Sequence, residues 1–480
     1  MLDLRRWMVV LGLVFVAVSV PACVGDETGG DAVDDGKADA WADSTEPREF
    51  VGVAQEHIQG WGGDGESLDV YFIPFNAVED RIAREIQLAQ SSIRVAMYNL
   101  RSERLGFLLL ERQRAGIRVE VYLDARQMEQ PYNDLDDRLR AEGLNIIAVR
   151  NTNSSTATLH DKLAVIDDRV VFMGSANWGD SALHQNNEVT MAFTSTELAR
   201  AVNQELDELA SGRHDRRAGD VNSHVQLHSS PEDRVDTVVE HAIDNAQERI
   251  YAAVFSFRLS WLTDAMIEAH RRGVEVVLIT DRKQSETTQE DDRLRQAGIP
   301  VIEALNDVTP YTAMHHKFVV IDGATTLVGS YNWTYSATFH NYEDLAVIAD
   351  DPEVAAAFEG EFGRVWQRYA PDQPNPITRT VPLDVMVQCD ATQWGDTVVL
   401  VGNTPELGAW DPSRGVRLSG DQWPSWNGLI DLRIGAALEY KFVVLSSDGA
   451  VRWETGDDHL ALLTTDPDEL AIRLRHEFRE

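Results

Sequence analysis

Cysteine and lysine are the scarcest informative residues of this chain. Only two cysteines occur in 480 residues, so a disulfide scaffold cannot hold the fold together. Only five of the 43 basic residues are lysines, and each invites the question of what a compact ammonium does at its position. Acidic residues outnumber basic ones by 79 to 43, and the formal net charge of −36 disfavours a protein that coats nucleic acid.

Long apolar runs are also scarce, and the one at the start of the chain has the features of a targeting signal. Arg5 and Arg6 precede an apolar run over residues 7–20, which is too short for a membrane span and predicts a secretory signal over residues 1–23. The run ends in a small residue followed by Cys23, which resembles a bacterial lipobox and predicts lipidation of Cys23. The alternative is plain cleavage near Ala22. We therefore expect an exported protein, anchored to the membrane at the cell envelope or otherwise secreted.

The stretch over residues 24–60 is expected to be a flexible acidic tether. Its first part is rich in Gly, Asp and Ala and shows neither a helical nor a strand period, so it cannot bury a core. The rest of the chain has the balance of a soluble globular protein, because 43% of all residues are apolar and 25% are charged. A length of 480 residues suits about three domains.

An internal repeat divides the body of the chain. The segments 92–124 and 249–281 align at an offset of 157 residues, and each runs apolar strand, amphipathic helix, glycine, apolar strand. This order predicts βαβ units around a mostly parallel, buried sheet. Two further blocks, 159–178 and 314–333, align at an offset of 155 residues. The chain therefore contains one unit written twice.

The second pair of blocks repeats a set of polar residues that can carry chemistry. Two of the five lysines occupy the same place in both copies, which coincidence explains poorly. The recurring residues of the first copy are His160, Lys162, Asp167, Ser175, Asn177 and Glu188, and those of the second are His315, Lys317, Asp322, Ser330, Asn332 and Glu343. His316 falls outside the pattern because residue 318 is Phe.

This pattern, H-x-K-x4-D followed by G-S-x-N in both copies, resembles the phospholipase D superfamily. The resemblance implies an α/β fold with two α/β/α lobes, over residues 61–215 and 220–370, related by a pseudo-twofold axis. It also implies phosphoric diester hydrolysis through a phosphohistidine, with His160 as the nucleophile and His315 as the acid. Both motifs stand in one chain, so we expect a monomer. A degenerate, inactive pair of motifs is the alternative.

The residue types suit this chemistry. One imidazole can attack phosphorus while the other donates a proton to the leaving oxygen, because imidazole titrates near neutral pH. The resemblance places Glu188 and Glu343 to orient the rings. The lysines, asparagines and serines would hold phosphoryl oxygens. Asp167 and Asp322 end their strands, and we expect them to act structurally or electrostatically. No cluster with metal-ligand spacing accompanies the motifs, so we predict neither a metal nor a cofactor.

The substrate is less well determined by the sequence. The acidic charge and the predicted lipid anchor favour a phospholipid such as phosphatidylcholine, cleaved by water or transferred onto an alcohol. A metal-independent endonuclease on the same fold is the first alternative, although the chain has no basic run. A glucan-binding surface protein with vestigial lobes is the second.

The last hundred residues are predicted to form a separate domain. A Pro-rich linker over 371–381 precedes short apolar strands separated by turn residues, which predicts an all-β, immunoglobulin-like sandwich over 382–480. Five of the twelve tryptophans lie in this region. Cys389 lies in an apolar run and is expected to be a core residue.

The tryptophan-bearing blocks of this domain resemble the starch-binding family 20 carbohydrate-binding modules. The blocks are VGNTPELGAWDP, WPSW, EYKF and VRWETGDDH, in that order. The resemblance implies an α-glucan partner and a sugar site at Trp426, Lys441 and Trp453, because indole faces stack on pyranose rings. Trp410 is expected in the core, and Trp423 and Trp426 could also be core residues. The family usually has Asn where Asp458 stands.

Overall fold

The structure is a computed structural model of the chain. It describes residues 56–59, 66–74, 77–131, 134–212, 219, 221–222, 224–305, 309, 312–378, 380–433, 437–462 and 472–479. The predicted signal over 1–23, its Cys23, and all of the predicted tether except residues 56–59 lie outside the described residues. Within the described residues, no helix is both long and apolar enough to cross a membrane.

Lobe 1 is built on a sheet with the strand order β1-β2-β8-β7-β6-β3-β4-β5. Its helices α1, α2 and α4 cover one face of the sheet, and α6 packs on the other. Its elements are β1 (Glu56–Gln59), β2 (Ser67–Ile73), α1 (Val78–Leu88), β3 (Ser92–Met97), α2 (Glu103–Arg114), β4 (Arg118–Asp124), α3 (Ala125–Met128), α4 (Leu135–Ala141), β5 (Ile146–Val149), β6 (Lys162–Ile166), β7 (Val170–Gly174), α5 (Asp180–His184), β8 (Glu188–Thr194) and α6 (Thr196–Ser211).

Lobe 2 repeats this plan with the strand order β12-β11-β10-β13-β14-β15-β9. Here α7, α8 and α10 cover the outer face, and α12 packs on the inner one. Its elements are β9 (Val225–Ser230), α7 (Val235–Asn245), β10 (Arg249–Val254), α8 (Ser260–Arg271), β11 (Glu275–Asp281), α9 (Arg282–Ser285), α10 (Glu290–Gln296), β12 (Val301–Ala304), β13 (Lys317–Ile321), β14 (Thr325–Gly329), α11 (Tyr335–Phe339), β15 (Glu343–Ile348) and α12 (Pro352–Tyr369).

Each sheet is mixed, whereas the sequence predicted a mostly parallel one. The βαβ units do pair β3, β4 and β5 in parallel, and likewise β10, β11 and β12. The motif strands β6, β7 and β8, however, are antiparallel neighbours, as are β13, β14 and β15. The reason is local, because a tight turn at Asp167 and Asp168, both with φ above +50°, reverses the chain after β6.

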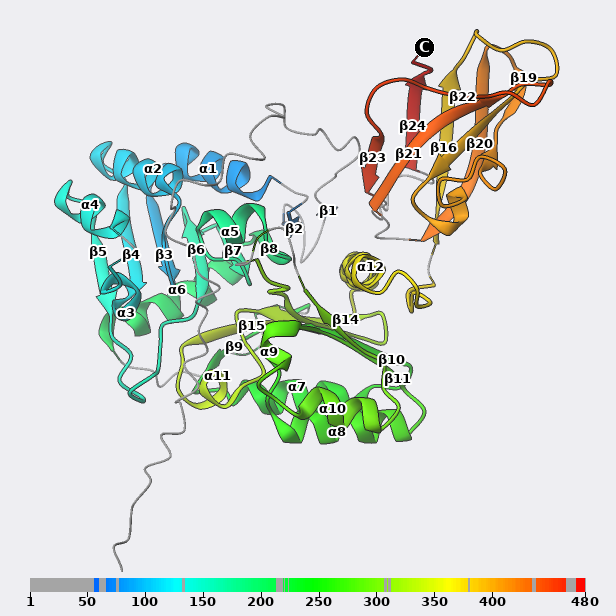
Figure 1. Ribbon diagram of the computed structural model, residues 1–480. Helices are drawn as coiled ribbons and strands as arrows, with labels where there is room; N and C mark the ends of the chain where they lie inside the picture. The colour runs from blue at the N-terminus through cyan, green and yellow to red at the C-terminus, as the bar shows by residue number, and fades with distance from the viewer. Residues whose placement is uncertain are drawn as a thin grey trace, which may run out of the picture.

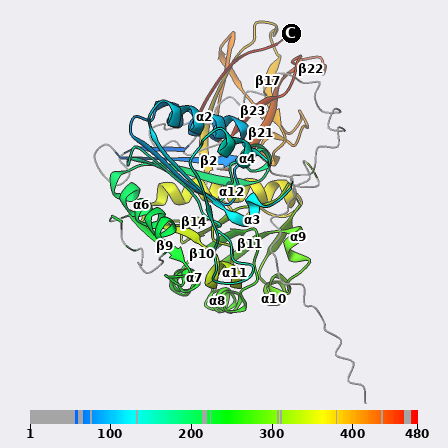
Figure 2. The same cartoon turned by 90° about the vertical axis from the view of Figure 1, so that its left-hand side faces the viewer.

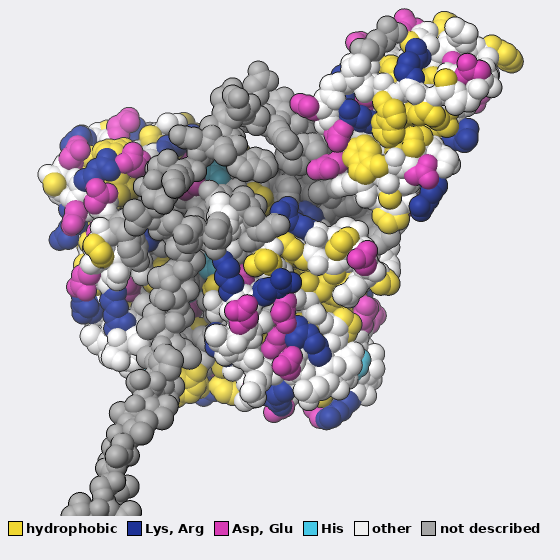
Figure 3. Space-filling model, in the orientation of Figure 1, with side chains coloured by type: hydrophobic (Ala, Val, Ile, Leu, Met, Phe, Trp, Pro, Cys, Tyr) yellow, Lys and Arg dark blue, Asp and Glu magenta, His cyan; other side chains and the backbone are white. Residues whose placement is uncertain are grey.

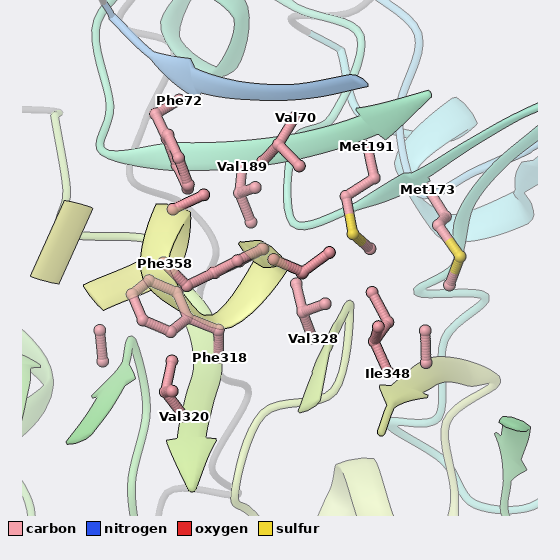
Figure 4. Close-up of a cluster of buried hydrophobic side chains, with 14 of the residues drawn as sticks. Val70, Phe72, Met173, Val189, Met191, Phe318, Val320, Val328, Ile348 and Phe358 are labelled. Carbon is pink, nitrogen blue, oxygen red and sulfur yellow. The ribbon is translucent and has the colours of Figure 1, made fainter. Parts of the chain in front are cut away.

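The two lobes share a hydrophobic core between their sheets. Figure 4 shows Phe72, Val189 and Met191 of lobe 1 facing Phe318, Val328 and other side chains of lobe 2. Figures 1 and 2 place α12 between the two sheets, where Phe358 and Phe362 of this helix are fully buried. Because each Å² of buried apolar surface contributes about 25 cal/mol, this shared core stabilises the packing of the two lobes against each other.

The C-terminal domain consists of two packed sheets, as predicted. Their strand orders are β19-β20-β16-β24 and β18-β17-β21-β22, with β23 beside β21. Cys389 is buried in the core of this sandwich, as expected. The elements are β16 (Thr380–Gln388), β17 (Thr397–Gly402), the 3₁₀ turn η1 (Pro405–Leu407), β18 (Val416–Arg417), β19 (Ser419–Gln422), β20 (Ser425–Arg433), β21 (Ala437–Leu445), β22 (Val451–Trp453), β23 (His459–Leu462) and β24 (Ile472–Glu477).

Candidate active site and glucan site

The two motif histidines stand just before the first residues of equivalent strands. Lys162 opens β6 and Lys317 opens β13, and each histidine precedes its lysine by two residues. Carboxylates at the ends of β4 and β11 bind the backbone of the residue that precedes each histidine. Asp124 accepts a hydrogen bond from the Leu159 amide at 2.9 Å, and Asp281 accepts one from the Met314 amide at 3.2 Å. These aspartates are the last residues of the aligned segments 92–124 and 249–281, and the repeat alone assigned them no role.

The histidines and glutamates pair across the lobes. His160 Nδ1 lies 2.5 Å from Glu343 Oε2, and His315 Nδ1 lies 2.8 Å from Glu188 Oε2. All four side chains are buried. Since an ionised carboxylate only accepts hydrogen bonds, this pairing puts a proton on Nδ1 of each ring and leaves Nε2 for chemistry, as a lone pair on an attacking ring or as a second N–H on a ring that acts as an acid. Each lobe therefore orients the histidine of the other.

Backbone contacts between the lobes fix the same two histidines. The His160 amide donates to the Tyr342 carbonyl at 2.8 Å, and the His315 amide donates to the Asn187 carbonyl at 2.9 Å. Asn187 and Tyr342 precede Glu188 and Glu343, so each cross-lobe glutamate is held beside its histidine by main chain as well. The sequence contained these residues in NNE and NYE without indicating this role.

The motif serines support the glutamates and do not face a substrate. Ser175 Oγ donates to Glu188 Oε2 at 2.6 Å, and Ser330 Oγ donates to Glu343 Oε2 at 2.8 Å. Both serines have no exposed surface. The prediction that they hold phosphoryl oxygens is therefore wrong, because their hydroxyls are committed to carboxylates behind the site.

Steric crowding explains why a glycine precedes each motif serine. A Cβ at Gly174 would lie 2.3 Å from the Val189 carbonyl oxygen, and one at Gly329 would lie 2.2 Å from the Asp344 carbonyl oxygen. Neighbouring strands can thus approach only where no side chain is present. This close approach carries Ser175 and Ser330 onto their glutamates.

The lysines lie beside the motif histidines, and a role of the lysines and asparagines in holding phosphoryl oxygens stays a prediction. Lys317 Nζ lies 2.9 Å from His315 Nε2 and 2.8 Å from the His315 carbonyl oxygen, while Lys162 Nζ lies 2.7 Å from the His160 carbonyl oxygen. Asn177 and Asn332 are both 8% exposed. An ammonium beside a motif histidine can stabilise charge that builds on a phosphoryl group.

Asp167 and Asp322 lie at the far ends of the motif strands. Asp167 accepts hydrogen bonds from the amides of Gln90, Ser91 and Ser92, and Asp322 accepts them from the amides of residues 247–249. Burial raises the pKa of Asp167, but these donors outweigh it and hold the pKa below its usual value. Both aspartates thus bind the turn before β3 or β10, and neither is placed for proton transfer.

The residue that follows each motif histidine differs between the lobes, although the motifs themselves match. His316 is completely buried and its Nε2 lies 2.7 Å from Glu361 Oε1 on α12, where Glu361 also pairs with Arg364. Burial lowers the pKa of His316. The equivalent residue of lobe 1 is Asp161, whose pKa is raised by burial and by Asp344 of the other lobe. His316 therefore faces α12 and not the site.

One face of the sandwich carries most of the predicted sugar site. Trp453 stands opposite Val443 in the β21–β22 pairing, and Lys441, two residues before Val443, points to the same side of the sheet. Lys441 Nζ donates to the Gly456 carbonyl at 2.6 Å and lies 3.4 Å from Asp458. Figure 3 shows a hydrophobic patch on the visible side of this domain.

The exposure of two tryptophans is the reverse of the expectation. Trp426 is only 7% exposed and packs in the sandwich core, so its assignment as a stacking surface is wrong. Trp410, expected in the core, is half-buried, and its ring centroid lies 6.4 Å from that of Trp453. Trp410 also has φ +65°, a strained backbone for a bulky residue and a feature that gathers at functional sites.

Within the described residues, no group of three or more His, Cys, Asp or Glu side chains could hold a metal ion. Metal independence itself stays a prediction, to be tested by chelation.

The folded lobes and the paired motif sets define a bilobal hydrolase fold of the phospholipase D class. Residues 82–210 and 239–366 match the family model described as "Cardiolipin synthase, PLD-like domain". Together these segments make up more than half of the chain, which therefore belongs to this phospholipase D-like family. Residues 380–470 match the model described as "Starch binding domain".

Individual relatives agree with both assignments. A mitochondrial cardiolipin hydrolase of Chlamydomonas reinhardtii is 34% identical over 168 residues, which are 34% of this chain and 71% of the relative. A glucoamylase of Neurospora crassa is 42% identical over 79 residues, which are 16% of this chain and 13% of the relative. A solved phosphatidylserine synthase of Haemophilus influenzae shares the fold at a TM-score of 0.50 and 14% identity, covering 62% of this chain and 86% of that one.

Proposed function

We propose that this protein is a phosphodiesterase of the phospholipase D type that cleaves phospholipid through a phosphohistidine. The observation that carries the proposal is the crossed pairing of His160 with Glu343 and of His315 with Glu188. Two oriented imidazoles in one buried site supply both the nucleophile and the acid that phosphodiester cleavage needs. Intact pairs in both directions argue against a vestigial site.

The reaction proceeds in two displacements. His160 Nε2 attacks phosphorus, the bond to the leaving oxygen breaks, and His315 gives that oxygen its proton. Water or an alcohol then attacks the phosphohistidine, His315 takes the proton of the attacking oxygen, and the P–N bond to His160 breaks. Lys162, Lys317 and the two motif asparagines hold the phosphoryl oxygens in both steps.

The proposed substrate class rests on the activity for which a relative is named and on the net charge of this chain. The relative from Chlamydomonas is named for cardiolipin hydrolysis, and the net charge of −36 disfavours long nucleic acids. Phosphatidylcholine and cardiolipin are therefore the phospholipids to compare. The sandwich would hold the enzyme on α-glucan through Trp410, Trp453 and Lys441, with stacking as the main contribution.

The test measures turnover of phosphatidylcholine, cardiolipin and plasmid DNA side by side, in excess EDTA. Release of head group or phosphatidic acid without DNA cleavage supports the proposal. Cleavage of DNA alone would replace it with an endonuclease, and no turnover of any substrate together with starch binding would leave a glucan-binding surface protein. Activity that EDTA abolishes and Mg²⁺ restores would contradict the metal-independent route.

Localisation is a separate part of the proposal. We expect export and membrane attachment through a lipid chain on Cys23, because that chain would be the anchor of an otherwise polar protein. Cys23→Ser should release the protein into the soluble fraction or leave the signal uncleaved. A mature N-terminus at Cys23 without added lipid mass would end this claim.

A further inference from the structure

The segment that joins lobe 2 to the sandwich is packed against α12. The Asn375 side chain donates to the Gly363 carbonyl at 2.9 Å, and the Ile377 side chain is only 2% exposed. A Cβ at Gly363 would lie 3.0 Å from Ile377, so the contact is close. Tyr251 Oη of β10 lies 3.4 Å from the Pro376 carbonyl oxygen. The Pro-rich sequence predicted a linker here, and the structure makes it a docked strap over residues 370–377.

The last residue of α12 contacts the catalytic machinery. Tyr369 Oη donates to Asn187 Oδ1 at 3.1 Å. Asn187 belongs to lobe 1 and is 2% exposed. Its carbonyl accepts the His315 amide at 2.9 Å, and its own amide donates to the Ala313 carbonyl at 3.0 Å. A chain of two hydrogen bonds therefore runs from the Tyr369 phenol to the backbone of the second catalytic histidine.

The same helix touches the second motif at another point. Glu361, two turns before Tyr369, binds His316, the neighbour of His315, at 2.7 Å. Burial opposes the charge on Glu361, yet Arg364 and the hydrogen bond from His316 hold its pKa below the usual value, so Glu361 stays ionised beside Arg364. The helix α12 thus reaches the backbone of His315 indirectly at two points, through His316 and through Asn187.

We propose that Tyr369 is a positioning residue for His315, acting through Asn187. The phenol fixes the Asn187 side chain, and Asn187 fixes the backbone from which the His315 ring reaches Glu188. Without the phenol, Asn187 Oδ1 loses a buried donor and the strand that carries His315 can shift. Since reacting groups misplaced by about 1 Å can cost about 100-fold in rate, a smaller shift is expected to lower kcat about tenfold.

The test compares Tyr369→Phe with Tyr251→Phe in the full chain. Both changes remove one phenolic hydroxyl beside the strap, but only Tyr369 leads to His315. We expect Tyr369→Phe to lower kcat about tenfold with little change in KM, while its melting temperature stays near that of the wild type. Tyr251→Phe should leave kcat unchanged. Asn187→Ser should reproduce the loss and make Tyr369→Phe add nothing further, because the two residues act in series.

A readout without turnover separates this inference from the proposed activity, on which its kinetic arm rests. The His315 ring is titrated by NMR, with His315→Asn to assign its signal. We expect a changed His315 pKa in Tyr369→Phe and the wild-type value in Tyr251→Phe. If folded Tyr369→Phe keeps the wild-type His315 titration, or keeps kcat where the wild type is active, the positioning role is wrong. If the wild type shows no turnover but Tyr369→Phe still changes the His315 titration, only the proposed activity is contradicted.

Discussion

At the scale of single residues, the crossed pairing of histidines with glutamates decides which carboxylate serves which step. Each glutamate follows the histidine of its own repeat by 28 residues, and local spacing would pair them within a lobe. The structure pairs His160 with Glu343, which is 183 positions away. Removal of one glutamate should therefore impair the histidine of the opposite lobe.

Glu343→Gln should act on formation of the covalent intermediate, because it orients the attacking His160. We expect a loss of roughly 100-fold or more in the rate of labelling by substrate, in line with other histidines that lose an orienting carboxylate. Glu188→Gln should instead slow the proton transfers of His315. Rapid-quench labelling separates the two steps, and His184→Gln, a change of an exposed side chain at the end of α5, is the control. Slower labelling in Glu188→Gln alone would place the nucleophile in lobe 2.

The motif histidines themselves provide the complementary experiment. His160→Asn should abolish the covalent label because it removes the attacking nitrogen, whereas His315→Asn should let the label accumulate because release lacks its base. Mass spectrometry of the quenched protein measures both. Loss of the label in His315→Asn with retention in His160→Asn would reverse the assignment.

The degree of burial of each tryptophan in the sandwich predicts whether its loss affects glucan binding or stability. Trp453→Ala and Trp410→Ala should each weaken β-cyclodextrin binding by roughly 1–3 kcal/mol, and Lys441→Ala by about 0.5–1.5 kcal/mol. Trp426→Ala should leave the site intact but cost about 3–5 kcal/mol of unfolding free energy, because it empties a core position. Calorimetric titration and thermal unfolding measure the two effects. Binding that depends on Trp426 and not on Trp410 would contradict these assignments.

At the scale of elements, the strap joins two domains that the sequence treats as independent. Ile377 packs on Gly363 of α12, in the core that both lobes share. The strap therefore belongs structurally to lobe 2, and the sandwich begins with β16. A boundary drawn from proline content alone would cut this contact.

Ile377→Ala should destabilise the lobes and spare the sandwich. Truncation of a fully buried isoleucine costs about 2–5 kcal/mol, which should lower the midpoint of the lobe transition in thermal unfolding. Isolated residues 378–480 should still fold and bind β-cyclodextrin, because their strands form complete sheets. An unchanged lobe transition in Ile377→Ala would show that the strap is not held.

At the scale of the whole molecule, acidic side chains meet where the lobes join. Burial raises the pKa of Glu205 on α6 to about 8, with Glu208 and Glu232 adding to it. Burial likewise raises the pKa of Glu232, just after β9, to about 7. Their stabilising contribution is complete below the unfolded value near 4.5 and is lost as the pH rises through 7 and 8.

The unfolding free energy should therefore fall between pH 5 and pH 9, on the order of a few kcal/mol. Urea titrations across this range measure the fall. Glu205→Gln should flatten it, because the amide keeps the polar contacts and cannot ionise. A pH dependence as steep in Glu205→Gln as in the wild type would assign the effect to other groups.

The sequence by itself determined the class of the protein. The repeat, the two motif sets and the tryptophan-bearing blocks predicted two phospholipase D-like lobes and a starch-binding sandwich, and these predictions are confirmed. They succeed because strand period, turn residues and motif spacing are local properties. The mixed sheet was missed because a short turn, and not the strand composition, sets the direction of β7 against β6.

Only the tertiary structure decided which residues work together. His160 finds its carboxylate in the other lobe, Tyr369 reaches His315 through Asn187, and the serines turn from the substrate to the glutamates. Trp426 is buried and Trp410 half-exposed, against expectation, because exposure depends on which strand covers each ring, and Gly420 of β19 lies against Trp426. Segments more than a hundred residues apart meet only when the lobes pack together. Local sequence patterns therefore do not predict these contacts.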